Sequence, residues 1–149
     1  MRRIALLLVV GSAVFLAACT GMGTATGTSG PSASKVVVVG SDFDLGVGRS
    51  ARVDGSSLTV SFDGVPEDSR CPLGVFCIQA GNATVSLTVT DGAGTKTPVK
   101  LYSNPTPTTP DSVKVGGYEI KLVAVQPIRR RDVTIAPASY VATLHLTKI

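Results

Sequence analysis

The chain has 149 residues, enough for one ordinary domain, and its 44% hydrophobic and 16% charged residues are typical of a folded protein rather than a disordered one. Its formal charge of +4 includes Arg2 and Arg3 at the N-terminus, so the rest of the chain lacks the basic excess of a nucleic-acid-binding domain. Aromatic residues make up 5% and Trp is absent, which disfavours partners that stack on aromatic faces.

The first nineteen residues have the pattern of a bacterial lipoprotein signal. Residues 4–16 form an apolar stretch that is too short for a membrane span of about 20 residues and has the length of a signal-peptide core. It ends in Leu16-Ala17-Ala18-Cys19, the aliphatic, small, small, Cys order of a lipobox. We therefore expect residues 1–18 to be a signal peptide and Cys19 to be acylated. The alternative is an ordinary signal peptide cut near Ala18, with Cys19 incidental.

The segment that follows predicts a tether. Two or more acyl chains hold a protein stably on a bilayer, at ~0.8 kcal/mol per buried methylene. Residues 19–34 have no periodicity and almost no apolar bulk, so we expect a lipid-anchored flexible linker that spans roughly 20 Å as a coil.

We expect the protein to lie in the cell envelope, facing the periplasm or the exterior. Because Thr20 is not Asp, comparison with the sorting of other lipoproteins implies the outer membrane in a diderm host.

Residues 35–149 alternate apolar and polar side chains with period two, which is typical of strands that bury one face. The alternation is clear at residues 58–62, 85–89, 118–124 and 140–146, and weaker at 36–39, 43–47 and 99–102. Turn signals separate these segments at residues 54–55, 63–64, 91–94, 104–105 and 116–117. Seven or eight short strands predict an all-β, immunoglobulin-like antiparallel β-sandwich, with a small β-barrel as the alternative.

Cys71 and Cys77 are the most specific feature of this domain. Two thiols this close in an oxidising compartment usually pair, and Pro72 and Gly74 allow the short loop to bend. We expect a disulfide that closes the loop before the strand at 83–90 and contributes ~2.4 kcal/mol in the chain-entropy model. A redox-active pair is the alternative, although the familiar redox motif is C-x-x-C at the start of a helix.

The residues around these cysteines resemble a known family. Residues 62–72 read FDGVPEDSRCP, and Cys77 and the AGNA of residues 80–83 follow. This resembles a family of small bacterial exported proteins, often lipoproteins, with the rough pattern EDSRCP…C…AG.A.V.L. Residues 118–127 are similar to the same family. The resemblance implies export and β architecture, and no activity. Similar sequences often carry Trp where Gln79 stands here.

The same region contains the candidate binding residues. Loops on a rigid scaffold commonly carry binding residues, and a closed loop loses less entropy on binding. We expect contacts from Glu67, Asp68, Arg70, Phe76 and Gln79. One alternative is that Asp68 and Arg70 cap turns or pair with each other. Another is a calcium site, which requires the fold to gather carboxylates from Asp42, Asp44, Asp63, Glu67 and Asp68.

Other reactive side chains give weaker signals. Arg129, Arg130 and Arg131 are the only basic cluster and predict either a solvated turn between strands or a contact with anionic lipid headgroups. His145 is the only histidine and falls on the polar face of the last strand. Because the sequence has no nucleophile elbow, phosphate loop or cluster of transition-metal ligands, we expect no catalytic residue, no metal and no cofactor.

These features favour a non-enzymatic binding or scaffolding module of the cell envelope. Its expected partners are the lipid bilayer, through acylated Cys19, and an unidentified envelope protein or ligand, with no nucleic acid. One alternative is a small protease inhibitor that presents the loop 71–77, and another is an enzyme with a dispersed active site. An inhibitor loop should project Val75 and Phe76, whereas a purely structural staple should bury at least one of them.

Overall fold

The structure is a computed structural model that describes residues 34–149. The signal peptide predicted for residues 1–18, Cys19 and the predicted linker up to residue 33 lie outside the described residues. Within residues 34–149, no helix has the length and apolar character that crossing a bilayer requires.

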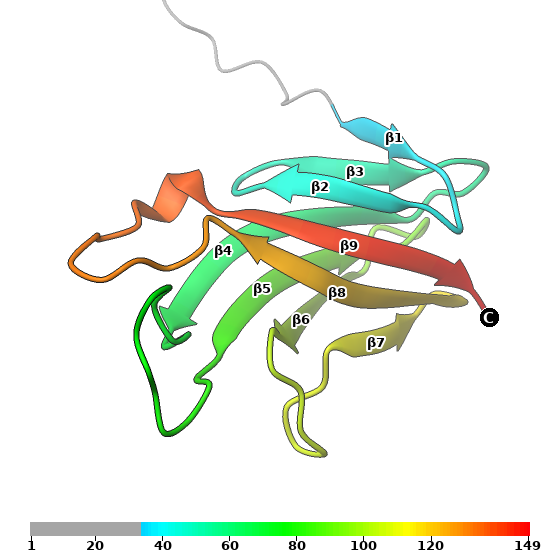
Figure 1. Cartoon of the computed structure of the whole chain (residues 1–149). Helices are drawn as coiled ribbons and strands as arrows, with labels where there is room; N and C mark the ends of the chain where they lie inside the picture. Colours follow the sequence, from blue (N-terminus) through cyan, green and yellow to red (C-terminus); the bar gives the residue numbers. More distant parts are fainter. Residues whose placement is uncertain (1–33) are drawn as a thin grey trace, which may run out of the picture.

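Nine strands and a single 3-10 turn make up the described part of the chain (Figure 1). They are β1 (Lys35–Val37), β2 (Asp42–Gly46), β3 (Ser50–Val53), β4 (Thr59–Asp68), β5 (Ala83–Thr90), β6 (Lys96–Tyr102), β7 (Ser112–Val115), β8 (Tyr118–Gln126), η1 (Pro137–Ser139) and β9 (Val141–Lys148).

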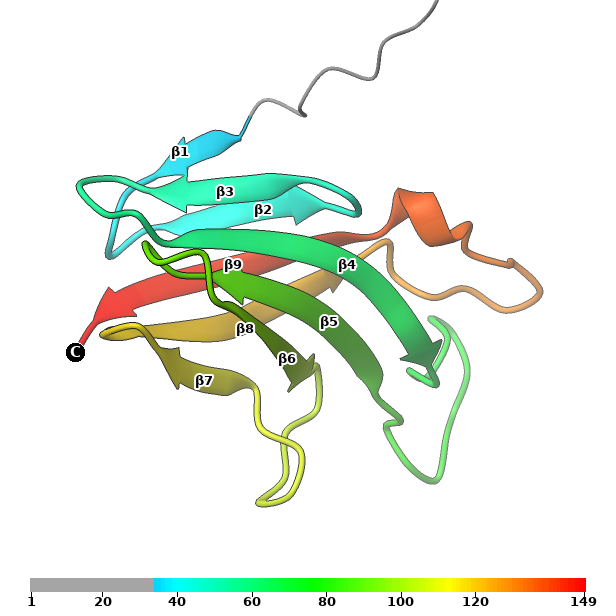
Figure 2. The same ribbon diagram turned by 180° about the vertical axis from the view of Figure 1, so that it is seen from behind.

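These strands form two sheets that pack face to face, as Figures 1 and 2 show. One sheet has the order β1-β3-β4-β5-β6 and the other the order β2-β9-β8-β7. All neighbouring strands are antiparallel except β1 and β3, which run parallel. The predicted β-sandwich is therefore confirmed, rather than the small barrel.

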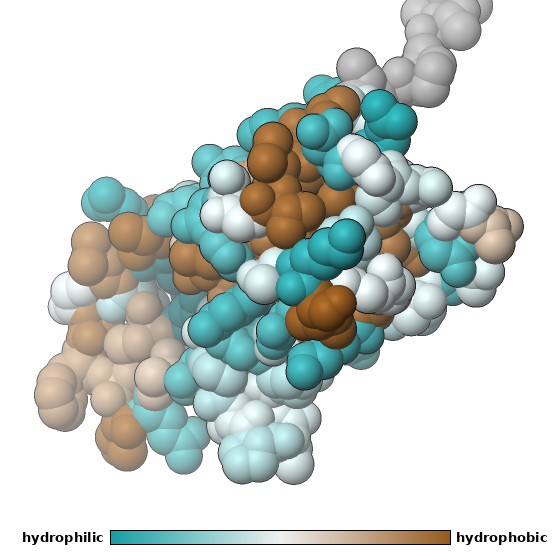
Figure 3. Space-filling model, turned by 90° about the vertical axis from the view of Figure 1, so that its right-hand side faces the viewer, coloured by the Kyte–Doolittle hydropathy of each residue, from teal (hydrophilic) through white to brown (hydrophobic). Residues whose placement is uncertain are grey.

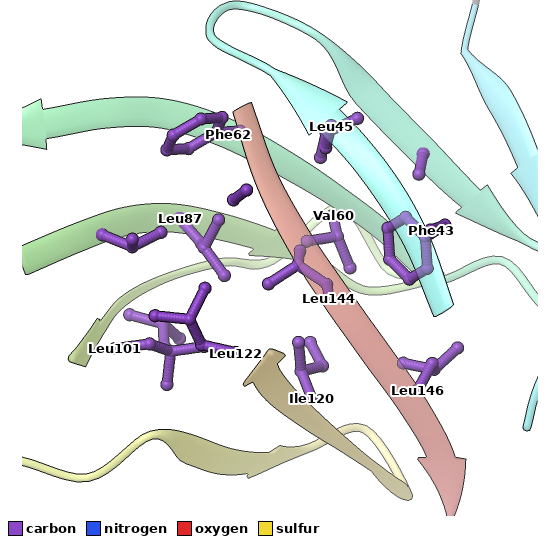
Figure 4. Close-up of a cluster of buried hydrophobic side chains, with 14 of the residues drawn as sticks. Phe43, Leu45, Val60, Phe62, Leu87, Leu101, Ile120, Leu122, Leu144 and Leu146 are labelled. Atoms are coloured by element: carbon purple, nitrogen blue, oxygen red, sulfur yellow. The ribbon is translucent and has the colours of Figure 1, made fainter. Parts of the chain in front are cut away.

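The core lies between the sheets, where alternate side chains of each strand meet (Figure 4). Phe62, Leu87 and Leu101 are buried on the five-stranded sheet. Ile120 and Leu144 are fully buried on the opposite sheet. Side chains with period two in sequence project to one face of a strand, and this is why the alternating segments seen in the sequence became strands.

Two local predictions differ in outcome. The turn at residues 116–117 is confirmed, because Gly116 and Gly117 have φ of 60° and 81°, the positive values that a tight primed hairpin turn requires. The turn predicted at residues 63–64 is wrong, since both residues lie inside β4. A β-bulge absorbs the extra residue there: Phe62 pairs with Leu87 and Gly64 with the next residue, Ser86.

Two long connections lie at the same end of the sandwich. The connection from β4 to β5 spans residues 69–82, and the connection from β8 to β9 spans residues 127–140. Figures 1 and 2 place both opposite the C-terminus. Figure 3 looks onto the C-terminal end, where hydrophobic and hydrophilic residues are interspersed. The disulfide loop and the arginines of residues 129–131 therefore lie at the end away from the C-terminus.

Candidate functional site

The disulfide predicted between Cys71 and Cys77 is confirmed. The loop that it closes prolongs the β4–β5 hairpin, because the amide of Cys71 donates to the carbonyl oxygen of Ala80 at 2.9 Å. At its tip the amide of Val75 donates to the carbonyl of Pro72 at 3.1 Å. Both the covalent bond and the backbone bonds therefore restrain the loop.

A largely buried ion pair lies just before this loop, at the end of β4. The guanidinium of Arg70 donates to both carboxylate oxygens of Asp68, from Nε to Oδ1 at 2.9 Å and from Nη2 to Oδ2 at 2.7 Å. The backbone amide of Arg70 donates to Oδ1 at 3.1 Å, and the hydroxyl of Tyr140 donates to Oδ2 at 3.0 Å. The side chains of Asp68 and Arg70 are only 8% and 16% exposed. Four donors thus satisfy the carboxylate inside the protein.

This arrangement sets the charge states of the three side chains. Burial alone raises the pKa of Asp68, but the hydrogen bonds and the positive charge of Arg70, with the Tyr140 hydroxyl, outweigh it, so the pKa lies below its usual value. The bond to Asp68 raises the pKa of Arg70. Burial and then the bond to Asp68 raise the pKa of Tyr140. The pair is therefore charged, and Tyr140 is neutral, at physiological pH.

The Arg70 side chain also joins the disulfide loop to the end of β8, which belongs to the opposite sheet. Its Nη1 donates to the carbonyl of Val125 at 2.6 Å and its Nη2 to that of Pro127 at 2.9 Å, where β8 ends. In return, Nη1 of Arg129 donates to the carbonyl of Arg70 at 3.0 Å. The amide of Leu73 donates to the carbonyl of Arg129 at 2.8 Å. The disulfide loop and the β8–β9 connection are therefore held side by side.

The structure divides the five predicted binding residues into two groups. Asp68 and Arg70 face inward and bond to each other, as the alternative interpretation expected. Glu67, Phe76 and Gln79 are exposed, and Phe76 is 99% exposed. Of the five predicted binding residues, only these three are therefore accessible to a partner.

The disulfide loop projects its apolar side chains. Val75 is half-buried and Phe76 fully exposed, so the burial expected of a purely structural staple is not found. Ile78, which the sequence reasoning missed, is 101% exposed. Its signal was an aliphatic residue next to a cysteine, in a segment without the period-two pattern that would bury it.

Five large apolar side chains, each more than half exposed, gather on the two loops. They are Leu73, Phe76, Ile78, Ile128 and Val133, and we call them, together with Arg130 and Arg131, the loop-end surface. Eight large apolar side chains are more than half exposed in residues 34–149, so more than half of them lie at this one end. This is a concentration rather than the scattered exposure that is normal for a soluble protein.

The two arginines of the loop-end surface are exposed, and no hydrogen bond or ion pair within residues 34–149 engages the side chain of either. Arg129 differs, since it is half-buried and bonded to Arg70. The predicted position of all three arginines between strands is confirmed.

The remaining reactive side chains lie apart from this end. Nδ1 of His145, on β9, is 2.5 Å from Oδ1 of Asp42, on β2, in a surface pair. Within residues 34–149, no three His, Cys, Asp or Glu side chains gather in a way that could hold a metal ion. The acidic residues considered for calcium are therefore not brought together, and the calcium interpretation is wrong for this arrangement.

A shallow hollow of about 320 Å³ lies beside the buried ion pair. Pro66, Arg129, Ile135 and Tyr140 are among the residues that line it. It is continuous with the β8–β9 connection and thus belongs to the same end of the sandwich.

Comparison of the chain with protein-family models, with curated proteins and with solved structures finds no match in any of the three.

Proposed function

We propose that this chain is a non-enzymatic binding module of the bacterial cell envelope, held at the membrane by acylated Cys19, and that it contacts its partner through the loop-end surface. The observation that carries this proposal is the full exposure of Phe76 and Ile78 on a closed loop. An apolar side chain gains its stabilisation only when it leaves water, at about 25 cal/mol per Å². Exposed apolar clusters therefore mark interaction sites.

The rigidity of the loop end supports the same proposal. The disulfide closes the loop, and Arg70 holds it against the β8–β9 connection through bonds to Val125 and Pro127. Such a loop has little conformational entropy left to lose when it binds. The buried pair of Asp68 and Arg70 then positions the contact surface without touching the partner.

Site-specific photo-crosslinking in living cells tests this proposal. A photoreactive residue replaces Phe76 or, separately, Ile78, and the matched control replaces Ile149, which is also exposed but lies at the C-terminal end. We expect adducts with lipid or protein from positions 76 and 78 and none from position 149. A chain that gives no adduct from either loop position does not use this surface, and the proposal fails.

The tether is tested separately. Replacing Cys19 with alanine removes the thiol that acylation needs, so the variant should be released from the membrane fraction. Phase partition in detergent and intact mass report the anchor. A Cys19→Ala protein that still partitions into detergent with added lipid mass contradicts the assignment.

A small protease inhibitor is the second candidate, because the disulfide loop projects Phe76 away from the domain. An exposed Phe on a restrained loop fits the hydrophobic primary pocket of a chymotrypsin-like protease. Inhibition assays with the wild-type protein and the Phe76→Ala variant test it, with Ile149→Ala as the control for an exposed apolar residue outside the closed loop. Inhibition that Phe76→Ala abolishes supports this candidate, and absence of inhibition by the wild type removes it.

A further inference from the structure

We propose that the loop-end surface docks on an anionic phospholipid bilayer, with Phe76 and Ile78 entering the boundary between headgroups and acyl chains and Arg130 and Arg131 contacting phosphates. This inference rests on the proposed function and names the partner of the same surface.

The apolar part of the surface has the composition that shallow insertion requires. Residues 71–80 contain no charged side chain. Phe76 and Ile78 are exposed on all sides, at 99% and 101%, with no protein wall around either of them. A bilayer interface accepts apolar side chains to a depth of about 5–10 Å without needing a preformed complementary pocket. Entry of this loop therefore buries apolar groups and carries no charge into the membrane.

Hydrogen bonds within the backbone of the loop also suit a membrane interface, where water is scarce. The amide of Cys71 bonds to Ala80 and that of Val75 to Pro72. Polar backbone groups that lack a partner are costly where water is scarce, and these bonds satisfy part of the loop internally. The disulfide keeps this arrangement in place when the surroundings change.

Charge complementarity selects an anionic lipid surface as the occupant. The β8–β9 connection carries Arg129, Arg130 and Arg131 against the single acid Asp132. Exposed Glu67, just before the disulfide loop, adds a second negative charge. The three arginines still outnumber the two acids, so the net charge of this end is positive. Each basic residue near an anionic bilayer strengthens binding about fivefold.

The two parts act together because the structure fixes them side by side. The bond from Leu73 to Arg129 and the bond from Arg129 to Arg70 join the neutral loop to the basic one. An apolar loop bonded to a basic loop combines insertion into the membrane interface with attraction to headgroups, and the two contributions to binding add. The domain would then be held at two points, at its lipid anchor and at its loop end.

Tryptophan fluorescence gives a direct test, because the chain contains no Trp and a single introduced one is the only reporter. The exported protein is purified from cell envelopes and reconstituted into vesicles of equimolar phosphatidylcholine and phosphatidylglycerol. We expect the emission of the Phe76→Trp variant to shift to shorter wavelength and to be quenched by bromine-substituted acyl chains. Ile149→Trp is the matched control and should show neither effect.

The arginine contribution is tested by the same measurement. Combining Phe76→Trp with Arg130→Gln and Arg131→Gln should reduce the quenching to the level seen in vesicles of phosphatidylcholine alone. Circular dichroism confirms that each variant keeps its β content, and Ile78→Trp provides a second reporter if position 76 does not tolerate the larger ring.

Two results would overturn the inference. One is the absence of quenching for both loop reporters in the anionic vesicles, and the other is equal quenching of the Ile149→Trp control. If the loop reporters stay in water while photo-crosslinking at position 76 gives a protein adduct, the lipid inference fails and the proposed binding function stands. If crosslinking also gives no adduct, both fail.

Discussion

Replacing Arg70 with alanine should destabilise the domain by ~3–5 kcal/mol, because the change leaves the buried carboxylate of Asp68 without its counter-charge. The Arg70 side chain donates two hydrogen bonds to Asp68 and one each to the carbonyls of Val125 and Pro127. The two charged bonds to Asp68 alone, at ~1.5–3 kcal/mol each, reach this range. A loss of this size is a large part of the ~5–15 kcal/mol that stabilises an ordinary domain.

Urea unfolding followed by circular dichroism measures the effect as a lower midpoint at constant slope. The matched control is Arg130→Ala, which removes an exposed arginine of the neighbouring loop and should cost less than ~0.5 kcal/mol. Adding Asp68→Asn to Arg70→Ala should cost less than the sum of the two single changes, since the second change removes the charge stranded by the first. A loss below ~1 kcal/mol for Arg70→Ala would show that water solvates the pair and would refute the reasoning.

Three further predictions concern the same loop. Because the folded protein lowers the pKa of Asp68, its ionised form stabilises the fold above the unfolded value of about 3.9, and this contribution is lost as pH falls through the folded pKa. Urea midpoints should therefore drop below about pH 4, and less steeply in Asp68→Asn. Cys71→Ala should lower stability by roughly 2–4 kcal/mol while keeping the β content, and thiol labelling of the native protein should find neither cysteine of this loop free. Gly81→Ala would place Cβ 1.8 Å from the carbonyl oxygen of Ser69 at a φ of +68°, so it should destabilise the domain more than Gly74→Ala, whose φ of +77° costs ~1–2 kcal/mol in open space. Equal losses for these two glycine variants would contradict the close approach.

The sequence predicted the elements whose burial is one-sided and regular. Residues 85–89 alternate strictly, and the structure buries Val85, Leu87 and Val89 while leaving the residues between them half-buried. Strands β3 and β7 were not predicted because only two of the four residues in each are apolar, whereas the shorter β1 lies in a run of valines. The Asp-Gly pair at 63–64 looked like a turn because a bulge in a long strand uses the same residue types.

The candidate site was predictable only in its local part. The pairing of Cys71 with Cys77 and the bond between Asp68 and Arg70 join residues that are close in sequence. The carbonyl of Val125 lies 55 residues from Arg70 in the chain, and no pattern in the sequence signals that contact. The exposure of Phe76 likewise depends on which neighbours the fold supplies, whereas its residue type alone predicts burial.

The pairing of β2 with β9 has a consequence for the order in which the molecule can assemble. His145 and Asp42 are partners separated by 103 positions, and β2 is the edge of its sheet, so among the strands of the structure it pairs with β9 alone. Contacts this distant in sequence require a long chain segment to be closed first, which slows folding. The four-stranded sheet therefore cannot be completed until residues 141–148 are available to pair with β2. A nascent chain that stops short of β9 accordingly leaves β2 as an unpaired strand.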